Sequence, residues 1–181
     1  RDGDYEVFVM NADGNEVVSL DQGAVDLDWG VVPANQFGAY FQSPDFEPGG
    51  EAIVFHRQNW DFGGDLHRVN LDGSGAEGLG PGNEPAVSPD GSKILYEVDL
   101  NVSLGGIGLM ESDGTRIAGG TGESSASGPV WSPDGQSYAF TRRNSNYEYE
   151  VWIKDLTQLS AVERPTGIVG KVTDWGFASL G

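Results

Sequence analysis

The chain has no cysteine among its 181 residues, and this absence excludes several classes of site. Disulfide bonds, thiolate metal ligands and a cysteine nucleophile all need a thiol, so none of them operates here. Histidine is nearly absent too, because His56 and His67 are the only two. Few side chains are therefore available as a base near neutral pH.

Basic residues are also scarce. Ten Lys and Arg stand against 28 Asp and Glu, which gives a formal net charge of -18. Such a charge repels the phosphates of nucleic acids and anionic membrane surfaces, so a nucleic acid is excluded as a partner. The carboxylates are spread through turns, which is typical of a solvated surface; calcium binding stays open as a weaker alternative, and no other cofactor or metal is expected.

Long hydrophobic runs are missing as well. No stretch approaches the roughly 18 apolar residues of a membrane span, so no transmembrane segment is predicted. We expect a secreted chain, in an extracellular or periplasmic location. The triplet Asn101-Val102-Ser103 has the pattern of a glycosylation acceptor at Asn101.

Glycine and proline, in contrast, are abundant. The chain has 28 glycines and 9 prolines, which indicate many tight turns, and its apolar residues do not follow the 3.6-residue period of a helix. Together these features predict an all-β fold.

A tripeptide repeat is the clearest feature of the sequence. Ser-Pro-Asp recurs at Ser43, Ser88 and Ser132, with separations of 45 and 44 residues. Proline fixes the backbone angle at a turn's second position and Asp bonds back to nearby backbone, so each copy is predicted to be a tight turn. A short apolar run follows each turn and predicts a strand, at Ala52–Phe55, Lys93–Tyr96 and Ser137–Phe140.

A second apolar run in each unit predicts another strand. Three of its four copies lead into Asp-Gly, at Gly14, Gly73 and Gly114, and this pair is a strong hairpin signal. The spacing of the copies places an insertion at Gly30–Gln42. The four runs are Val7–Asn11, Leu66–Asn70, Ile107–Glu111 and Val151–Asp155.

The units "PVWSPDGQSYAF", "PAVSPDGSKILY" and "RDGDYEVFVMNADG" resemble the TolB-type β-propeller repeat. The resemblance implies about four blades of four-stranded antiparallel sheet in a single repeat domain, 1–181. The terminal segments together match one blade, so we expect them to share it. The predicted blade parts are 1–24, 25–82, 83–122, 123–169 and 170–181.

Candidate site residues come from the loops, where a rigid scaffold usually carries its binding residues. One group lies in "HRQNWDFGGD", and the other lies in the aromatic insertion. No catalytic residue is predicted, because spacing locates no partner base for His56 and the G-x-S-x-G motif of serine hydrolases does not occur. Trp131 and His67 recur with the repeat and are expected to pack in the blades. The predicted ligand-binding residues are His56, Arg57, Asn59, Trp60, Phe37 and Tyr40.

Three hypotheses of function remain open, because repeats of this type occur in periplasmic translocation proteins, peptidases and polysaccharide-degrading enzymes. The favoured one is a non-catalytic secreted or cell-surface module that binds a protein or carbohydrate, or serves in structural assembly. The second is the propeller portion of a peptidase or of a carbohydrate-active enzyme similar to a polysaccharide lyase, with His56 and Arg57 in an acidic-sugar site. The third is self-assembly through the incomplete terminal blade into a homo-oligomer or filament.

Overall fold

Strands make up all the regular structure that the computed structural model describes, which covers residues 8–10, 18–19, 40–59, 63–98, 105–121, 126–157 and 163–172. No helix occurs in these ranges, so none of the described segments is a long apolar helix able to cross a membrane. The prediction of an all-β fold is confirmed.

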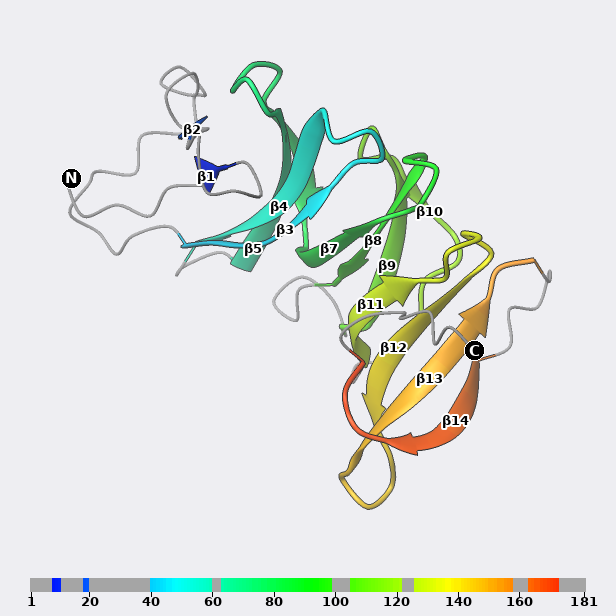
Figure 1. The fold of residues 1–181 in the computed structure, drawn as a ribbon. Coiled ribbons are helices and arrows are strands. Elements are labelled where there is room, and N and C mark those ends of the chain that lie inside the picture. The colour runs from blue at the N-terminus through cyan, green and yellow to red at the C-terminus, as the bar shows by residue number, and fades with distance from the viewer. Residues whose placement is uncertain are drawn as a thin grey trace.

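The strands form three four-stranded antiparallel sheets, each built from consecutive segments of the chain (Figure 1). Sheet 1 consists of β3 (Tyr40–Phe46), β4 (Ala52–Asn59), β5 (Gly63–Asn70) and β6 (Glu77–Pro81). Sheet 2 consists of β7 (Asn83–Val87), β8 (Lys93–Glu97), β9 (Ile107–Glu111) and β10 (Arg116–Ile117). Sheet 3 consists of β11 (Ala126–Trp131), β12 (Ser137–Arg143), β13 (Tyr149–Asp155) and β14 (Glu163–Val169). A short pair, β1 (Phe8–Val9) and β2 (Val18–Ser19), precedes them.

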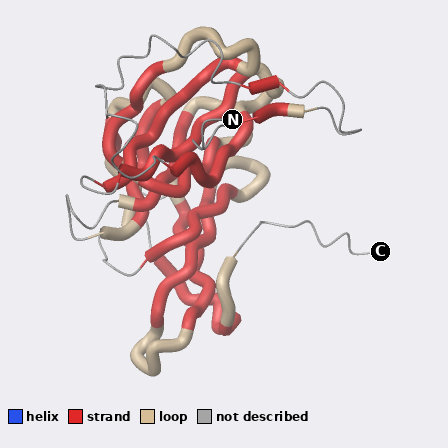
Figure 2. The backbone as a smooth tube through the Cα atoms, turned by 90° about the vertical axis from the view of Figure 1, so that its left-hand side faces the viewer, coloured by secondary structure: helices blue, strands red, loops and turns tan. Residues whose placement is uncertain are grey.

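The three sheets lie within the predicted blade parts 25–82, 83–122 and 123–169, and each has its strands in chain order. The sheets pack face to face (Figures 1 and 2). Strand β7 contacts both β3 and β11, so the first strands of the three sheets lie side by side. This is the blade arrangement of a β-propeller.

Two buried clusters hold the sheets together. Because successive side chains of a strand point to opposite faces, sheet 2 contributes to both clusters. Between sheets 1 and 2 the core contains Val54, Leu66, Leu79, Ile94, Tyr96 and Met110. Between sheets 2 and 3 it contains Leu95, Ile107, Leu109, Ala126, Trp131, Tyr138 and Phe140. Trp131 is thus part of the blade core, as predicted.

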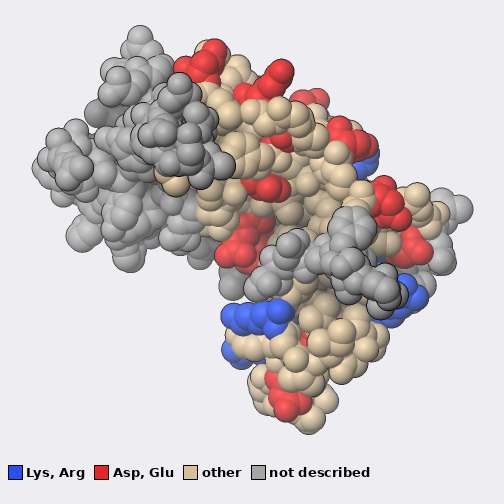
Figure 3. Space-filling model, in the orientation of Figure 1, with Lys and Arg blue, Asp and Glu red and all other residues tan. Residues whose placement is uncertain are grey.

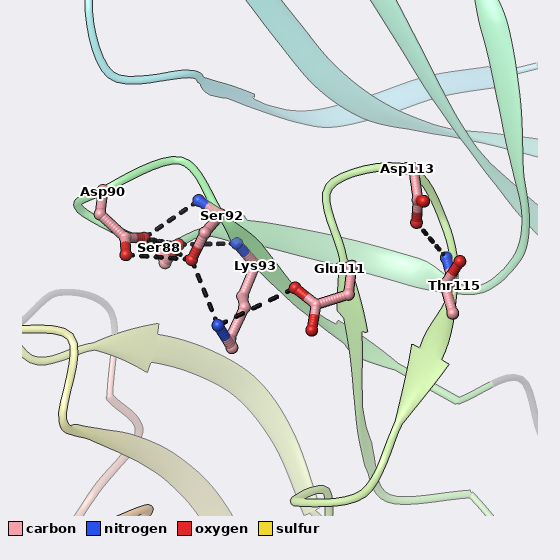
Figure 4. A network of polar contacts seen from close by, with 7 residues as sticks. All are labelled: Ser88, Asp90, Ser92, Lys93, Glu111, Asp113 and Thr115. Atoms are coloured by element: carbon pink, nitrogen blue, oxygen red, sulfur yellow. Dashed lines mark hydrogen bonds and ion pairs between the residues drawn. The ribbon is translucent and has the colours of Figure 1, made fainter.

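The Ser-Pro-Asp-Gly turn of sheet 2 joins β7 to β8 (Figure 4). The carboxylate of Asp90 accepts hydrogen bonds from the Ser88 hydroxyl at 2.7 Å and from the Ser92 amide at 3.0 Å. These bonds, chiefly the one from Ser88, lower the pKa of Asp90 to about 2. Gly91 completes the turn with a φ of 72°, which is costly for residues with a Cβ. The Ser132 turn repeats the pattern, and both turns are as predicted.

The third predicted turn, at Ser43-Pro44-Asp45, is wrong, and so is the assignment of Tyr40 to Gln42 to an insertion. All of these residues belong to strand β3, which pairs with β4. The equivalent turn begins instead at Glu47, whose carbonyl accepts the amide of Gly50. Pro44 fits a strand because β3 is an edge strand of its sheet, where a missing N–H breaks no ladder bond.

Two of the predicted Asp-Gly turns, at Gly73 and Gly114, are present; their amides donate to Asn70 and Glu111 respectively. The third, at Gly14, lies outside the described residues.

Candidate functional site

The stack of sheets has two opposite ends with different structures. The turns that begin at Glu47, Ser88 and Ser132 lie at one end, which we call the turn face. Strands β3, β7 and β11 begin at the other end, where β4, β8 and β12 finish. We call this second end the start face.

The predicted site residues that the structure describes lie toward the start face. Tyr40 begins β3, and His56, Arg57 and Asn59 lie in the last half of β4. The pairing of Tyr40 with Gln58 brings the two segments together. Phe37, Trp60 and the predicted glycosylation site Asn101 lie outside the described residues.

His56 and Arg57 do not share a pocket, because neighbours in a strand point to opposite faces of the sheet. His56 is buried, and its Nδ1 accepts the amide of Glu84 at 3.4 Å, across the interface with sheet 2. Burial lowers the pKa of His56, so the ring is neutral at pH 7. Arg57 lies on the other face, with Asp65 opposite it on β5.

His67 shares that other face of sheet 1. It is buried, and its ring centroid lies 5.8 Å from that of Phe55. Burial, with a smaller contribution from the charge of Arg57, lowers the pKa of His67 to about 4. Its position is that of a packed core side chain.

A pair of glutamates on sheet 2 is the main feature that the sequence did not reveal. Glu84 lies in β7 and Glu97 ends β8, and their carboxyl groups share a hydrogen bond. Glu97 Oε1 also accepts the amide of Gly128 in sheet 3 at 2.7 Å. Burial raises the pKa of Glu97 to about 7; the Gly128 bond opposes this rise and the charge of Glu84 adds to it. Glu97 therefore retains its proton close to neutral pH.

Each first strand carries a bulge toward the start face. Ser43, Glu84 and Gly128 have φ values of 49°, 45° and 59°, each precedes a proline, and the ladder register shifts at each of them. Bulges bend the strand and redirect side chains, and left-handed residues other than glycine are concentrated at functional positions. In the sequence, the corresponding signal is a residue followed by proline at Ser43-Pro44, Glu84-Pro85 and Gly128-Pro129. Matching the units on Ser-Pro-Asp hides this equivalence, because Ser43 is then paired with Ser88 and Ser132.

Further hydrogen bonds tie the first strands to each other. The carboxylate of Asp45 accepts the amide of Val87 at 2.7 Å, and the indole of Trp131 donates to the carbonyl of Ala86 at 2.9 Å. Burial raises the pKa of Asp45, while its two backbone hydrogen bonds act in the opposite direction. Near the turn face, the first strands are thus joined by bonds between sheets as well as by apolar contact.

A shallow groove of about 380 Å³ lies toward the start face, along β8, β9 and β10. Its walls include Tyr96 and Arg116, and the guanidinium donates to the Tyr96 hydroxyl at 2.9 Å and to the carbonyl of Pro81 at 2.6 Å. The groove is narrowed by Tyr96, which packs on Gly108 so closely that a Cβ there would lie 2.1 Å from the ring.

Among the described residues, no hydrogen bond joins His56 to a hydroxyl group, and no cluster of three or more His, Asp or Glu side chains could hold a metal ion. What the start face does provide is a set of hydrogen bonds that links all three sheets.

The comparisons with known proteins agree with this architecture. The chain matches no family model. It is 38% identical over 78 residues to the Tol-Pal system protein TolB of Zymomonas mobilis, a match that covers 40% of this chain and 17% of that protein. It is also similar to the crystal structure of TolB from Acinetobacter baumannii, with a TM-score of 0.65, 16% identity, and coverage of 88% of this chain and 37% of the other.

A second solved structure with this fold is the β-propeller domain of the trilobed protease from Pyrococcus furiosus, whose topology is described as open velcro. Its TM-score is 0.54 with 17% identity, and the match covers 71% of this chain and 44% of that one. The chain therefore spans well under two thirds of these proteins.

Proposed function

The chain consists of TolB-like β-propeller repeats, and from this premise we propose that it is a non-catalytic segment that binds another protein in the periplasm through its start face. The observation that carries the proposal is the set of contacts that joins the three sheets there. Glu84 is held by His56 of sheet 1, and Glu97 is held by Gly128 of sheet 3. The face is thus pre-organised, which lowers the entropy cost of binding a partner.

The other hypotheses from the sequence have less geometric support. An acidic-sugar site on His56 and Arg57 would need both side chains in one pocket, whereas they point to opposite faces of β4. The likeness to a protease propeller is one of fold, so a peptidase role would rest on residues outside the described repeats.

The test is binding of the chain to purified Pal, the other component in the relative's name, measured by biolayer interferometry. Glu84 is exposed and Glu51 is an exposed glutamate next to the opposite, turn face, so Glu84→Arg and Glu51→Arg are a matched pair. We expect Glu84→Arg to weaken binding about tenfold or more and Glu51→Arg to leave it unchanged.

Three outcomes contradict the proposal. The first is equal binding of Pal by the two variants, and the second is no binding of the original chain at about 100 μM Pal. The third is cleavage of a uronic acid polymer that disappears in His56→Ala, which would establish the carbohydrate-active alternative.

A further inference from the structure

One loop of sheet 3 departs from a rule that the other turns follow. In five turns of the described chain, the amide of a glycine donates to the carbonyl of the residue three positions earlier. Each of these glycines has a left-handed backbone, with φ between 67° and 85°. The β12–β13 loop makes the same bond, from the Tyr147 amide to the Asn144 carbonyl, with Tyr147 at a φ of 63°. The five glycines are Gly50, Gly73, Gly91, Gly114 and Gly135.

Tyr147 gains no packing in return for this strained backbone, because it is 81% exposed. A bulky residue with a positive φ is an outlier, and strain of this kind is retained mainly at functional positions. Tyr147 is therefore suited to contact with a binding partner.

Other exposed apolar side chains gather at the same place. Ile168 and Val169, at the end of β14, are 61% and 65% exposed. The amide of Gly170 donates to the carbonyl of Tyr149, which brings the end of β14 to the start of β13, two residues from Tyr147. Clustered apolar exposure marks an interaction site, whereas single exposed residues do not.

Two cations border this cluster. The guanidinium of Arg143 lies 5.0 Å from the ring centroid of Tyr149 and donates to its hydroxyl at 3.0 Å. The ammonium of Lys171 lies 4.5 Å from the same centroid. Among the described residues, no ion pair within 4.0 Å involves either cation, whereas Arg142 and Lys154 both pair with Glu163. Arg143 is therefore available to a partner's carboxylate, and so is Lys171, although its charge also acts on Glu97.

The position of these cations contrasts with the charge of the whole chain. Half of the ten Lys and Arg lie between Arg142 and Lys171, although the chain carries 28 acidic residues. Figure 3 shows blue atoms gathered on the lobe of sheet 3, while red atoms predominate over the other two sheets. An acidic molecule is repelled by most of the surface and least by this lobe.

We propose that an acidic protein segment with interspersed apolar side chains docks on the tip of sheet 3. The tip is the surface formed by Arg143, Tyr147, Tyr149, Ile168, Val169 and Lys171. Aromatic and Arg side chains are the residues that most often dominate such interfaces. The tip lies on the start face, so the inference rests on the proposed protein-binding function and adds the chemistry of the partner.

Docking occurs through side chains and not by addition of a strand to β14. Pro165 has no N–H to donate, and Gly167, with a φ of 77°, interrupts the regular strand geometry. Both features protect a sheet edge against pairing.

The test uses a fluorescein-labelled peptide of alternating Glu and Leu as the probe, with a Lys-Leu peptide of the same length for comparison, and measures fluorescence anisotropy. Tyr147→Gly is the sharpest variant, because glycine suits the backbone and the fold is kept. We expect it, and the double variant Arg143→Gln with Lys171→Gln, to weaken binding of the Glu-Leu peptide about tenfold each. Phe46→Ala and Lys93→Gln, which change an exposed aromatic and a cation elsewhere, are the controls and should bind as the original chain does.

The inference is overturned if Tyr147→Gly binds the Glu-Leu peptide as tightly as the original chain, or if the Lys-Leu peptide binds equally well. It is also overturned if the original chain binds neither peptide, or if light scattering shows a dimer that Tyr147→Gly abolishes, since a second copy is then the occupant. Binding of Pal that depends on Glu84 but not on the tip would remove this inference and leave the proposed function in place.

Discussion

Glu97 is a half-buried carboxyl whose titration should control stability near neutral pH. It lies between Glu84, whose charge repels it when it ionises, and the amide of Gly128, which it accepts at 2.7 Å. The variant Glu97→Gln removes the ionisation, and the amide oxygen can still accept the Gly128 bond. We therefore expect the variant to be more stable than the original chain at pH 8 and similar to it at pH 5.

The direction of this pH effect follows from the difference between the pKa of Glu97 in the folded and in the unfolded chain. The folded pKa of Glu97 is about 7 against an ordinary 4.5, so the folded chain holds this proton more tightly than the unfolded chain. Its contribution to stability is present below pH 4.5 and is lost as the pH rises through about 7. One pKa unit corresponds to about 1.4 kcal/mol, so the upper limit is about 3 kcal/mol. Because solvent reaches this carboxyl, we expect about 1–2 kcal/mol, or about 2–8 °C in Tm for a chain of this size.

The assay is thermal unfolding followed by circular dichroism at pH 5, 6, 7 and 8. His56 works in the opposite direction, since its lowered pKa makes the folded state less stable as the pH falls below 6.5. The decisive quantity is therefore the difference between the original chain and Glu97→Gln at each pH. Glu51→Gln, an exposed change at the other end of the stack, is the control. A difference that does not grow between pH 5 and pH 8 refutes the reasoning.

Two further predictions concern the packing of Tyr96 on Gly108 and the hydrogen bond from Trp131 to Ala86. Gly108→Ala should destabilise the chain by about 1–3 kcal/mol, because its Cβ would lie 2.1 Å from the Tyr96 ring. Gly78→Ala, whose Cβ would lie at an ordinary 3.6 Å from its nearest neighbour, should be close to neutral, and urea unfolding distinguishes the two; equal midpoints would contradict the steric account. Trp131→Phe removes the indole bond to the carbonyl of Ala86 and should cost about 1–2 kcal/mol, measured in the same way. An unchanged midpoint for Trp131→Phe would show that this bond does not contribute to joining sheets 2 and 3.

Much of the fold could be predicted because its signals are local. Strands β8, β9, β12 and β13 follow from short apolar runs, and the turns at Ser88 and Ser132 follow from residues whose own backbone and side-chain bonds close the turn. The same tripeptide at Ser43 forms a strand, because pairing with β4 and the Asp45 bond to Val87 override the local preference. Tertiary contacts therefore decide whether this tripeptide forms a turn or part of a strand.

The candidate site was less accessible to prediction. His56 and Arg57 are adjacent in sequence, but the alternation of a strand separates them, while Glu84 and Glu97 are brought together by pairing of β7 with β8. The significance of Tyr147 depends on its φ, which no composition or spacing indicates.

The sequence by itself determined the all-β class, the repeat and its TolB-like character, and most of the strand and turn positions, because these depend on residues close together in the chain. Only the tertiary structure decided that Ser43 lies in a strand and not in a turn, that burial raises the pKa of Glu97, and that the tip of sheet 3 is exposed. Those properties arise from desolvation, register and backbone conformation, which exist only once the sheets have packed against each other.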